Sequence, residues 1–425
     1  ALFALQHRGQ ESCGIAVNRD GVIRVHKDLG LVRDVFTKEN LAALGHGQIA
    51  VGHTRYSTTG AVSRENAQPL VVSHVNGQMA VAHNGNLTNA AELRRQLELS
   101  GAIFHTTNDT EVISYLITRE RLHADSIEQA VERAMPKLLG AYSLVIMSPR
   151  KLIAARDAVG FRPLCMGRMP GGKVVFASET CALDIVGAEF VRDVNPGEIV
   201  TLDRNGIRSR DYSMYKRNCM CAMEYIYFAR PDSDIECCNV HAFRKESGRL
   251  LFKEAPADAD VVIGVPDSSL SAAIGYSEAS GIPYEMGLVK NRYIGRTFIQ
   301  PSQAMREKGV KMKLSAVRSL VAGKRVALID DSIVRGTTSL RIVRLLKAAG
   351  AKEVHVRIAS PKMTHPCFYG VDTSTCDQLI GHRCSVEEIR RQIEADSLAF
   401  LSEGALLRAG NRKEMCMACF TGRYP

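Results

Sequence analysis

The chain has 425 residues, enough for two or more domains, and its 45% hydrophobic and 24% charged composition is typical of globular proteins. No apolar run approaches the length of a membrane span and no signal-peptide pattern opens the sequence, so we expect a cytoplasmic protein without a membrane partner. The net charge of +10 is concentrated between residues 290 and 325, where ten Lys or Arg accompany a single acid, Glu307. No helix-turn-helix or zinc-finger pattern surrounds this stretch, which favours a polyanionic small molecule over nucleic acid as its partner.

Short alternating strand patterns dominate the amino-terminal half of the sequence. Examples are residues 49–52, 79–82 and 142–146. Two helical patterns interrupt them, near residues 89–99 and 109–121, with Asn89 and Asp109 as the predicted N-caps. Strand runs with separate helices indicate an α+β layered sandwich.

The pattern changes after Arg217, where strands begin to alternate with helices. The elements are strands at residues 261–265, 326–329 and 354–359, and helices at residues 270–280 and after Thr338. This alternation predicts an α/β domain with a mostly parallel sheet at residues 218–425, following a first domain at residues 1–217. Ligands bind at the carboxyl ends of parallel strands, and the polar loops 266–269 and 330–338 both fall on that edge.

Four short motifs in the first half indicate a reactive site when they are taken together. They are Gln-His-Arg-Gly-Gln-Glu at residues 6–11, Gly-His-Thr-Arg-Tyr-Ser-Thr-Thr-Gly at 52–60, Ala-His-Asn-Gly-Asn-Leu at 82–87 and Asn-Asp-Thr-Glu at 108–111. Each alone is weak, since Asn-Gly most often marks a hairpin turn. In this order and at these spacings they resemble the class II glutamine amidotransferase domain, an N-terminal nucleophile (Ntn) hydrolase with an αββα sandwich.

This resemblance implies a glutamine site. Asn84 and Gly85 correspond to the oxyanion hole, which donates a side-chain amide and a backbone N–H to the tetrahedral intermediate. Arg55 corresponds to the group that holds the glutamine α-carboxylate, a task suited to a bidentate guanidinium. Asp109 corresponds to the ligand of the α-amino group, and Thr58 lines the same pocket by analogy.

The nucleophile of this family is an amino-terminal cysteine, a short strand before Gln-His-Arg-Gly. Arg8 and Gly9 match the catalytic loop beside it, but no residue of this sequence fills the nucleophile's position. We expect a chain that lacks its amino-terminal strand, so that the intact protein hydrolyses glutamine and the sequence as written does not. Cys13 follows the motif in a strand-like run and is predicted to be a buried core thiol.

Residues 326–338 are the most informative stretch of the second half. An apolar strand leads into Asp330 and Asp331, and a loop precedes the next helix pattern. Unpaired N–H groups and the helix dipole favour an anion there, while adjacent carboxylates would repel it unless they face ribose hydroxyls or a divalent cation. The alternative is an Asp-Asp turn with a Thr N-cap, but the whole block resembles the phosphoribosylpyrophosphate (PRPP) signature of type I phosphoribosyltransferases.

This second resemblance implies a PRPP site. Asp330 and Asp331 correspond to the groups that bind the ribose hydroxyls or Mg²⁺, with Ser268 near the same ion. The loop that binds the phosphate comprises Ser332, Arg335, Gly336, Thr337 and Thr338. Lys290 is the candidate for the pyrophosphate, and the basic stretch 290–313 is expected to close over PRPP and exclude water.

Together the two halves resemble the amidophosphoribosyltransferase family, from Gln6 to Tyr424, including the family-like segments 224–233 and 290–299. The resemblance implies that ammonia from glutamine attacks the anomeric carbon of PRPP, giving 5-phosphoribosylamine, pyrophosphate and glutamate in the first committed step of purine synthesis. Purine nucleotides are expected inhibitors because they share the ribose 5-phosphate, and the family suggests dimers or tetramers. The alternatives are a PRPP-binding regulator and another class II glutamine amidotransferase, such as a glucosamine-phosphate synthase.

Twelve cysteines are many for a reducing compartment, which disfavours disulfides, so some are candidate ligands. Similarity to the family's iron–sulfur subclass implies a 4Fe–4S cluster. Its ligands would be Cys221, Cys367, Cys416 and Cys419. Four thiols suit zinc equally well on ligand type alone. Cys219 and the Cys237–Cys238 pair are the rival ligands.

Overall fold

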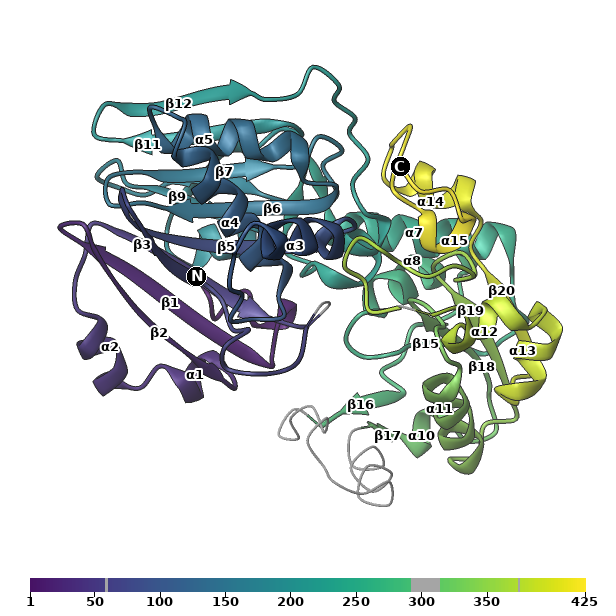
Figure 1. Cartoon of the computed structure of the whole chain (residues 1–425). Helices are drawn as coiled ribbons and strands as arrows, with labels where there is room; N and C mark the ends of the chain where they lie inside the picture. Colours follow the sequence, from purple (N-terminus) through teal and green to yellow (C-terminus); the bar gives the residue numbers. More distant parts are fainter. Residues whose placement is uncertain (58–59, 292–313, 374) are drawn as a thin grey trace.

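The computed structural model of the protein describes residues 1–57, 60–291, 314–373 and 375–425, and these form two parts that lie side by side (Figure 1). The first part ends with β12 (Gly206–Asp211), and the second begins with the short helix η3 (Glu224–Phe228). In the described ranges, no helix combines the length and the apolar character that crossing a membrane requires.

The first part is built on antiparallel sheets. The largest has the order β12, β11 (Glu198–Asp203), β7 (Leu152–Arg156), β6 (Gly140–Met147), β5 (Gly77–Leu87) and β4 (Leu70–His74). Two three-stranded sheets accompany it, with the orders β2 (Val22–Leu29), β1 (Ser12–Arg19), β3 (Ile49–Arg55) and β10 (Glu189–Asp193), β8 (Cys165–Arg168), β9 (Val174–Ala177).

Strand β5 shows why these sheets form layers. Met79 and Val81 pack with α3 (Ala90–Leu99), α4 (Asp109–Arg121) and α5 (Ile127–Ala134), whereas Ala80 and Ala82 pack against β1 and β3. Alternate side chains of a strand point to opposite faces, so one strand contributes to both cores. On the outer side, α1 (Val32–Val35) packs on β1, and α6 (Thr180–Ile185) packs on β8 and β9. The layers are helix, sheet, sheet, helix, as predicted. The buried Cys13 packs on α1, also as predicted.

One of the two predicted helix caps needs correction. Asn108, not Asp109, caps α4, because its backbone is extended and its side chain accepts a hydrogen bond from the Thr110 N–H. Asp109 is the first helical residue, and its carboxylate accepts from the Leu87 N–H instead. Asn89 is the N-cap of α3, as predicted, although its side chain makes no capping bond and donates to the Lys137 carbonyl instead.

The second part contains the predicted parallel sheet. Its order is β15 (Val261–Gly264), β18 (Arg325–Asp330), β19 (Glu353–Ile358) and β20 (Ser397–Phe400). Both faces are buried, as expected for near-continuous apolar strands. The helices are α7 (Val240–Glu254), α8 (Leu270–Ser280), α10 (Arg318–Val321), α11 (Thr337–Ala348), α12 (Ile380–Arg383), α13 (Val386–Gln392), α14 (Glu403–Ala409) and α15 (Ala418–Thr421). Two small pairs, β13 (Asp234–Ile235) with β14 (Cys238–Asn239) and β16 (Leu288–Lys290) with β17 (Leu314–Ala316), complete this part.

Helices α7 and α8 cross at very short distance because each has a glycine at the crossing. A Cβ on Gly248 would lie 1.9 Å from the Ala272 carbonyl oxygen, and one on Gly275 would lie 1.8 Å from the Lys245 carbonyl oxygen. The close crossing brings Arg244 of α7 beside Ser269, which precedes α8, and both line one small cavity.

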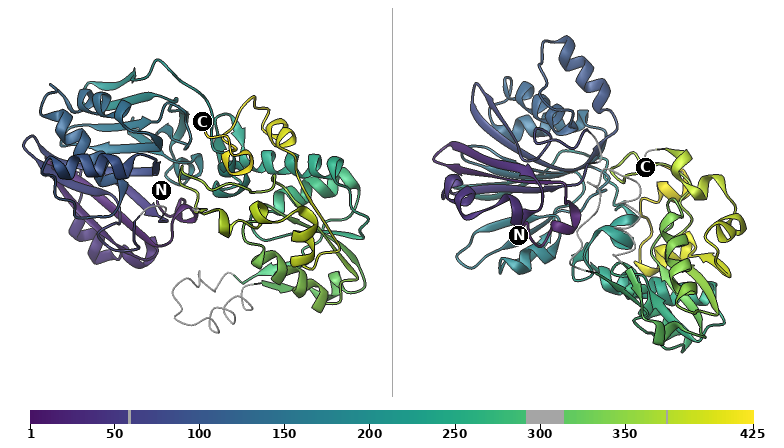
Figure 2. Two further views of the ribbon diagram at one scale, coloured as in Figure 1. Left: turned by 45° about the vertical axis from the view of Figure 1, so that its right-hand side comes forward. Right: turned by 90° about the horizontal axis from the view of Figure 1, so that it is seen from below.

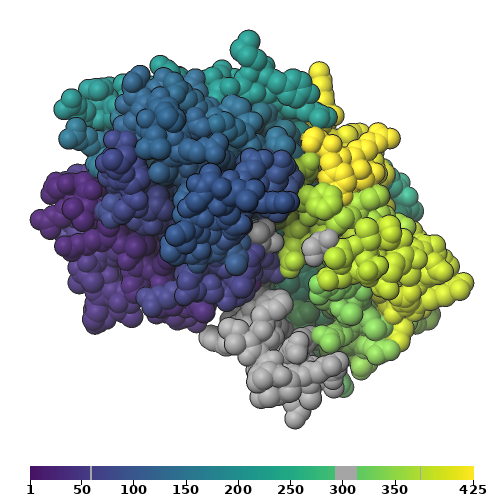
Figure 3. All heavy atoms as spheres, viewed as in Figure 1, coloured from purple at the N-terminus to yellow at the C-terminus, as the bar shows by residue number. Residues whose placement is uncertain are grey.

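The two parts share an interface that includes buried charges. Figure 2 shows them side by side from two further directions, and in Figure 3 the carboxyl-terminal segment (yellow) lies against the first part. Arg8 and Arg162 of the first part bind Glu224 of the second, and Arg156 of the first binds Glu236 of the second. Such pairs fix the relative position of the parts, since a buried charge that loses its partner is costly.

Candidate active sites

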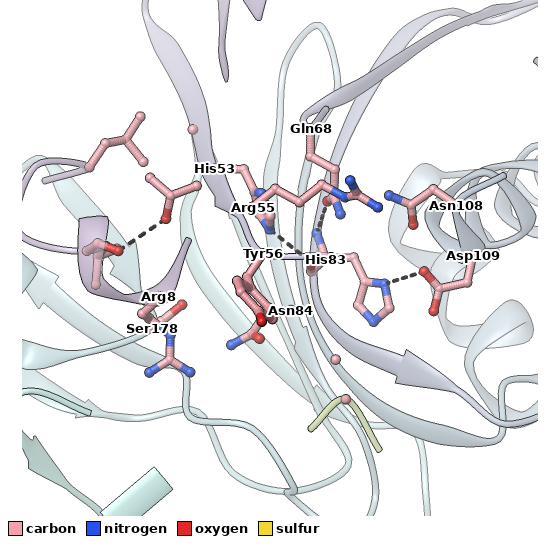
Figure 4. A pocket seen from close by; sticks show the side chains of 16 residues that line it. Arg8, His53, Arg55, Tyr56, Gln68, His83, Asn84, Asn108, Asp109 and Ser178 are labelled. Atoms are coloured by element: carbon pink, nitrogen blue, oxygen red, sulfur yellow. Dashed lines mark hydrogen bonds and ion pairs between the residues drawn. The ribbon is translucent and has the colours of Figure 1, made fainter. Parts of the chain in front are cut away.

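A cavity of about 100 Å³ opens where the ends of β3 and β5 meet the start of α4 (Figure 4). The motif residues that line it are Arg8, Arg55, Asn84, Gly85 and Asp109. Four motifs far apart in sequence therefore converge at one cavity. Thr58, also predicted here, lies outside the described residues.

Asp109 and Arg55 give the cavity one charge of each sign. The Asp109 carboxylate accepts from the Leu87 N–H at 2.9 Å and lies 3.4 Å from His83 Nδ1. Burial alone would raise the pKa of Asp109, but His83 and the N–H groups of Leu87 and Thr110 outweigh it and the pKa is lowered. Burial lowers the pKa of Arg55, opposed by Glu11 and Asp109. An amino acid, which carries an ammonium and a carboxylate, suits this pair of charges.

Asn84 and Gly85 supply the features of an oxyanion hole. In the described part of the chain, the buried Asn84 Nδ2 has no hydrogen-bond partner, an arrangement that is unusual unless a ligand completes it. Gly85 has φ of +142°, and a Cβ there would lie 2.1 Å from the Ala141 carbonyl oxygen. Only glycine fits this close strand pairing.

Arg8 and Gly9 support the cavity wall. Arg8 donates to Glu179 at 2.6 Å and to Glu224 at 2.8 Å, so its charge is bound by two carboxylates. Gly9 packs directly beneath β3, where a Cβ would lie 2.5 Å from backbone atoms of Thr54 and Arg55. Their contacts position the strand end that carries Arg55.

The second site lies at the carboxyl end of β18. Asp330 and Asp331 are each less than one-tenth exposed. Ser269 Oγ and the Asp331 N–H donate to Asp330, and Ser332 Oγ donates to Asp331 at 2.6 Å. Burial raises the pKa of both acids, and for Asp330 the neighbouring Asp331 charge raises it further. Arg244 opposes this rise for Asp331 but does not outweigh burial, so a divalent cation or sugar hydroxyls would stabilise the pair further.

An open helix terminus follows the acids. Gly336 precedes α11 with φ of +78°, and no side chain caps the helix. Arg335, Thr337 and Thr338 are exposed around this terminus. The free N–H groups and the helix dipole provide an anion site. Lys290 lies on β16, where its ammonium donates to Asp267 at 2.9 Å. Most of the stretch 290–313 lies outside the described residues.

Comparisons with known proteins agree with this two-site arrangement. Residues 53–184 match a model of the glutamine amidotransferase domain, and residues 241–364 match a model of the phosphoribosyl transferase domain. The whole chain is 53% identical to an amidophosphoribosyltransferase of Bacillus subtilis, covering 90% of that protein, and 50% identical to one of Methanocaldococcus jannaschii, covering 93%. A solved B. subtilis glutamine PRPP amidotransferase, complexed with ADP and GMP, superposes with a TM-score of 0.93 at 52% identity, covering all of this chain and 93% of that one.

The chain belongs to the amidophosphoribosyltransferase family. It is an enzyme of glutamine-dependent amidotransfer to PRPP in purine biosynthesis, as the sequence predicted. An amidophosphoribosyltransferase needs both cavities, whereas a PRPP-binding regulator needs no glutamine site. Another class II amidotransferase would not carry the phosphoribosyltransferase domain.

The four cysteines predicted to hold a cluster in this amidophosphoribosyltransferase come together from three segments. Cys221 and Cys416 form a parallel backbone bridge, and Cys367 Sγ accepts from the Tyr369 N–H at 3.3 Å. Burial raises the pKa of Cys419, and Cys221, Cys367 and Cys416 raise it further. All are free thiols, although within the described ranges no three potential ligands surround a common metal position. The donor type suits a thiolate-bound metal group, but the positions of these thiols in the described structure do not form a metal site. Burial raises the pKa of Cys416 to about 12, and the rival ligand Cys219 raises it further.

Several residues at the two sites were not predicted from sequence. They are Glu179, Glu224, Arg162, Arg244 and Gly370. Glu224 lies in the family-like segment 224–233, which is the one sequence feature that could have drawn attention to it. The others reach the sites through packing between distant segments, which no local pattern reveals.

Proposed function

We propose that the cavity between β3, β5 and α4 binds glutamine and that the acid pair with the start of α11 binds PRPP. The observation that carries the proposal is the buried pair Asp330 and Asp331, with raised pKa values, followed directly by an uncapped helix terminus. The two carboxylates favour a cation, and the helix terminus favours an anion. A sugar phosphate with its metal ion supplies both.

In the glutamine cavity, Arg55 binds the α-carboxylate and Asp109 the α-amino group of the substrate. Asn84 Nδ2 and the Gly85 N–H donate to the oxygen that becomes negative when the amide carbon is attacked. Arg8 and Gly9 hold the wall in position. A cysteine thiolate is the nucleophile of the family's glutamine domain, and among the described residues that line the cavity none is cysteine.

In the second site, Asp330 and Asp331 bind the ribose hydroxyls or Mg²⁺, with Ser268 beside the ion. The 5-phosphate lies on the amino end of α11, held by Ser332, Arg335, Gly336, Thr337 and Thr338. The Lys290 ammonium gives up its hydrogen bond to Asp267 and binds the pyrophosphate instead. Mg²⁺, when bound, neutralises charge on the leaving pyrophosphate. Ammonia attacks the anomeric carbon while pyrophosphate leaves.

The four-cysteine group Cys221, Cys367, Cys416 and Cys419 binds a 4Fe–4S cluster. The proposed reaction moves no electrons, so the cluster is structural and pins the carboxyl-terminal segment to the rest of the protein. Iron and sulfide analysis of anaerobically purified protein tests this assignment. Stoichiometric zinc in place of iron would refute it.

Three further properties belong to the proposal. Purine nucleotides inhibit at the PRPP site, supported by the ADP and GMP bound to the B. subtilis relative. The protein is cytoplasmic, does not bind nucleic acid, and forms a dimer or tetramer. The domain boundary lies between Arg217 and Asn218.

The decisive test measures two activities in the presence of PRPP and Mg²⁺. Pyrophosphate release with ammonium salts reports the second site alone, and glutamate formation reports the first. Both are measured with and without a cysteine-bearing segment placed ahead of Ala1. Replacing Asp330 and Asp331 together by Asn should lower ammonia-dependent turnover by about 100-fold or more. Turnover that survives this double substitution would contradict the proposal.

A further inference from the structure

Asn66 is a buried residue next to the glutamine cavity. It is 3% exposed and is not among the described residues that line the cavity. Its Nδ2 donates to the Ala61 carbonyl oxygen at 2.7 Å and to Thr107 Oγ1 at 2.8 Å, and its Oδ1 accepts from the Thr107 N–H at 3.0 Å. One side chain therefore joins the segment that follows β3 to the segment that precedes α4.

The segment on one side of Asn66 holds Arg55. The Ala61 carbonyl oxygen, which accepts from Asn66, also accepts from Arg55 Nη1 at 3.3 Å. Thr107 Oγ1 accepts from the Ala61 N–H at 3.2 Å as well as from Asn66. A Cβ added to Gly60 would lie 2.7 Å from the same hydroxyl oxygen, so this segment packs closely on Thr107. The position of the Arg55 guanidinium thus depends on contacts that Asn66 and Thr107 make.

The segment on the other side of Asn66 leads to Asp109. Thr107 stands two residues before Asp109, and Asn108 Nδ2 between them donates to the Asn66 carbonyl oxygen at 3.3 Å. Asn108 is the N-cap of α4, whose first residue is Asp109. In Figure 4 the Arg55 guanidinium points toward Asn108. The two charged groups proposed to bind glutamine are therefore held by one buried amide.

Contacts with β2 keep Asn66 in place. The Lys27 ammonium donates to the carbonyl oxygens of Glu65 and Ala67, at 3.0 and 2.5 Å, and so binds the residues before and after Asn66. A buried amide whose hydrogen bonds are all made is costly to displace, because displacement leaves polar groups unpaired. The anchor is therefore rigid, and it fixes the distance between the segments on its two sides.

We propose that Asn66 and Thr107 are positioning residues that set the separation between Arg55 and Asp109, and thereby the selectivity of the cavity for an α-amino acid. The inference rests on the glutamine cavity proposed above and names residues that give it specificity. An α-amino acid carries its carboxylate and its amino group on one carbon, so it binds both partners only when they stand at a matching distance. A glutamine analogue that lacks one of the two groups needs no such match.

The test uses a pair of substitutions at Thr107 in the complete enzyme. Thr107→Val keeps the shape but removes the oxygen that accepts from Asn66 and Ala61, whereas Thr107→Ser keeps that oxygen. Asn66→Asp is a second route, since a carboxylate accepts from the Thr107 N–H but cannot donate to Ala61. Glutaminase kcat and KM are measured with glutamine, with the analogue that lacks the α-amino group and with the analogue that lacks the α-carboxylate. Ammonia-dependent pyrophosphate release is measured in the same samples.

Asn18→Asp is the matched control in the same part of the protein. Asn18 is 1% exposed, donates through Nδ2 to the Ser148 and Pro149 carbonyl oxygens at 3.2 and 2.9 Å, and accepts from the Gly21 N–H at 3.0 Å. It too joins distant segments, but it is not among the described residues that line the cavity. Any general effect of losing a buried amide should appear in this control as well.

A displacement of about 1 Å can cost about 100-fold, so Thr107→Val and Asn66→Asp should raise the KM for glutamine by about 10- to 100-fold, with a smaller change in kcat. Their preference for glutamine over each analogue, expressed as kcat/KM, should fall by at least about fivefold. Thr107→Ser and Asn18→Asp should keep the wild-type preference. Ammonia-dependent turnover should stay near wild type in every variant.

A folded Thr107→Val enzyme that prefers glutamine over both analogues as strongly as wild type would overturn the inference. An equal loss of preference in Thr107→Ser or Asn18→Asp would also overturn it, because the lost hydrogen bonds would not be the cause. If a thermal melt shows that Asn66→Asp does not fold, the two Thr107 variants decide. A wild-type enzyme that uses both analogues as well as glutamine would instead refute the proposed glutamine cavity.

Discussion

The two sites differ in how their charges are balanced. In the glutamine cavity, Asp109 lies beside His83 and its pKa is lowered, and Arg8 is bound by Glu179 and Glu224. At the PRPP site, Asp330 and Asp331 lie together in a buried position and their pKa values are raised. At the first site the partners of the buried carboxylate outweigh the effect of burial, whereas at the second site they do not.

This difference indicates which site is preformed. A compensated cavity keeps its shape without substrate and binds glutamine through groups already in place. An acid pair whose charge is only partly balanced, beside an open helix terminus, should be stabilised when a cation and an anion bind. PRPP with its metal ion should therefore order the second site.

The largest expected effect concerns the oxyanion hole. Asn84→Ala removes the unpartnered amide donor and should lower glutamine-dependent kcat by about 10²- to 10³-fold. Asn84→Asp, which keeps the size but removes the donor, should be equally poor. Ammonia-dependent turnover in the same preparations should stay near wild type, and a parallel loss of it would show that Asn84 acts on the fold instead.

A smaller effect is expected at the charged end of glutamine. Asp109→Asn removes the carboxylate that we propose binds the α-amino group, and it should raise the KM for glutamine by about 10- to 100-fold, with a lesser change in kcat. The folded pKa of Asp109 is lowered, so its stabilising contribution is present above the ordinary Asp pKa and is lost as pH falls through the folded value. Urea unfolding of wild type and variant should therefore differ at pH 7 and converge in acid.

The opposite pH dependence of stability is expected at the acid pair of the second site. The folded pKa of Asp330 is raised, so its stabilising contribution is present below the ordinary Asp pKa and is lost as pH rises through the folded value. Asp330→Asn should then stabilise the ligand-free protein at pH 8 by about 1 kcal/mol and change little in acid. Thermal melts across this range measure it, and Mg²⁺ should raise the melting temperature of wild type only. A variant less stable than wild type at pH 8 would show that the acids are already compensated.

An effect of similar size is expected at Gly336, the glycine that precedes α11. Gly336→Ala places a side chain at φ of +78° and 2.9 Å from Ile380 Cδ1, and should destabilise the protein by about 1–2 kcal/mol. Gly323→Ala is the matched control, with φ of +73° but nothing within 4 Å of the added carbon. Only Gly336→Ala should also raise the KM for PRPP. Equal KM values for the two variants would place the phosphate elsewhere.

Sequence reasoning located the cavity residues because each lies in a short local motif. Arg55 ends β3, Asp109 begins α4 and Asn84 lies in β5, all elements whose patterns are visible, and Asp330 and Asp331 stand at the end of an apolar strand. Glu224 and Arg244 could not be assigned a role in the same way, since their contacts join segments separated by many residues. The N-cap of α4 was misplaced by one residue because Asn108 and Asp109 both favour that position, and only the Leu87 N–H decides between them.

The most direct test is a crystal structure of the complete enzyme with Mg²⁺ and an unreactive PRPP analogue. We predict that the 5-phosphate accepts hydrogen bonds from N–H groups in the first turn of α11, and that Asp330 and Asp331 contact the ribose hydroxyls or the ion. An analogue bound with its phosphate away from α11, or with both acids still turned to Ser269 and Ser332 alone, would contradict the account.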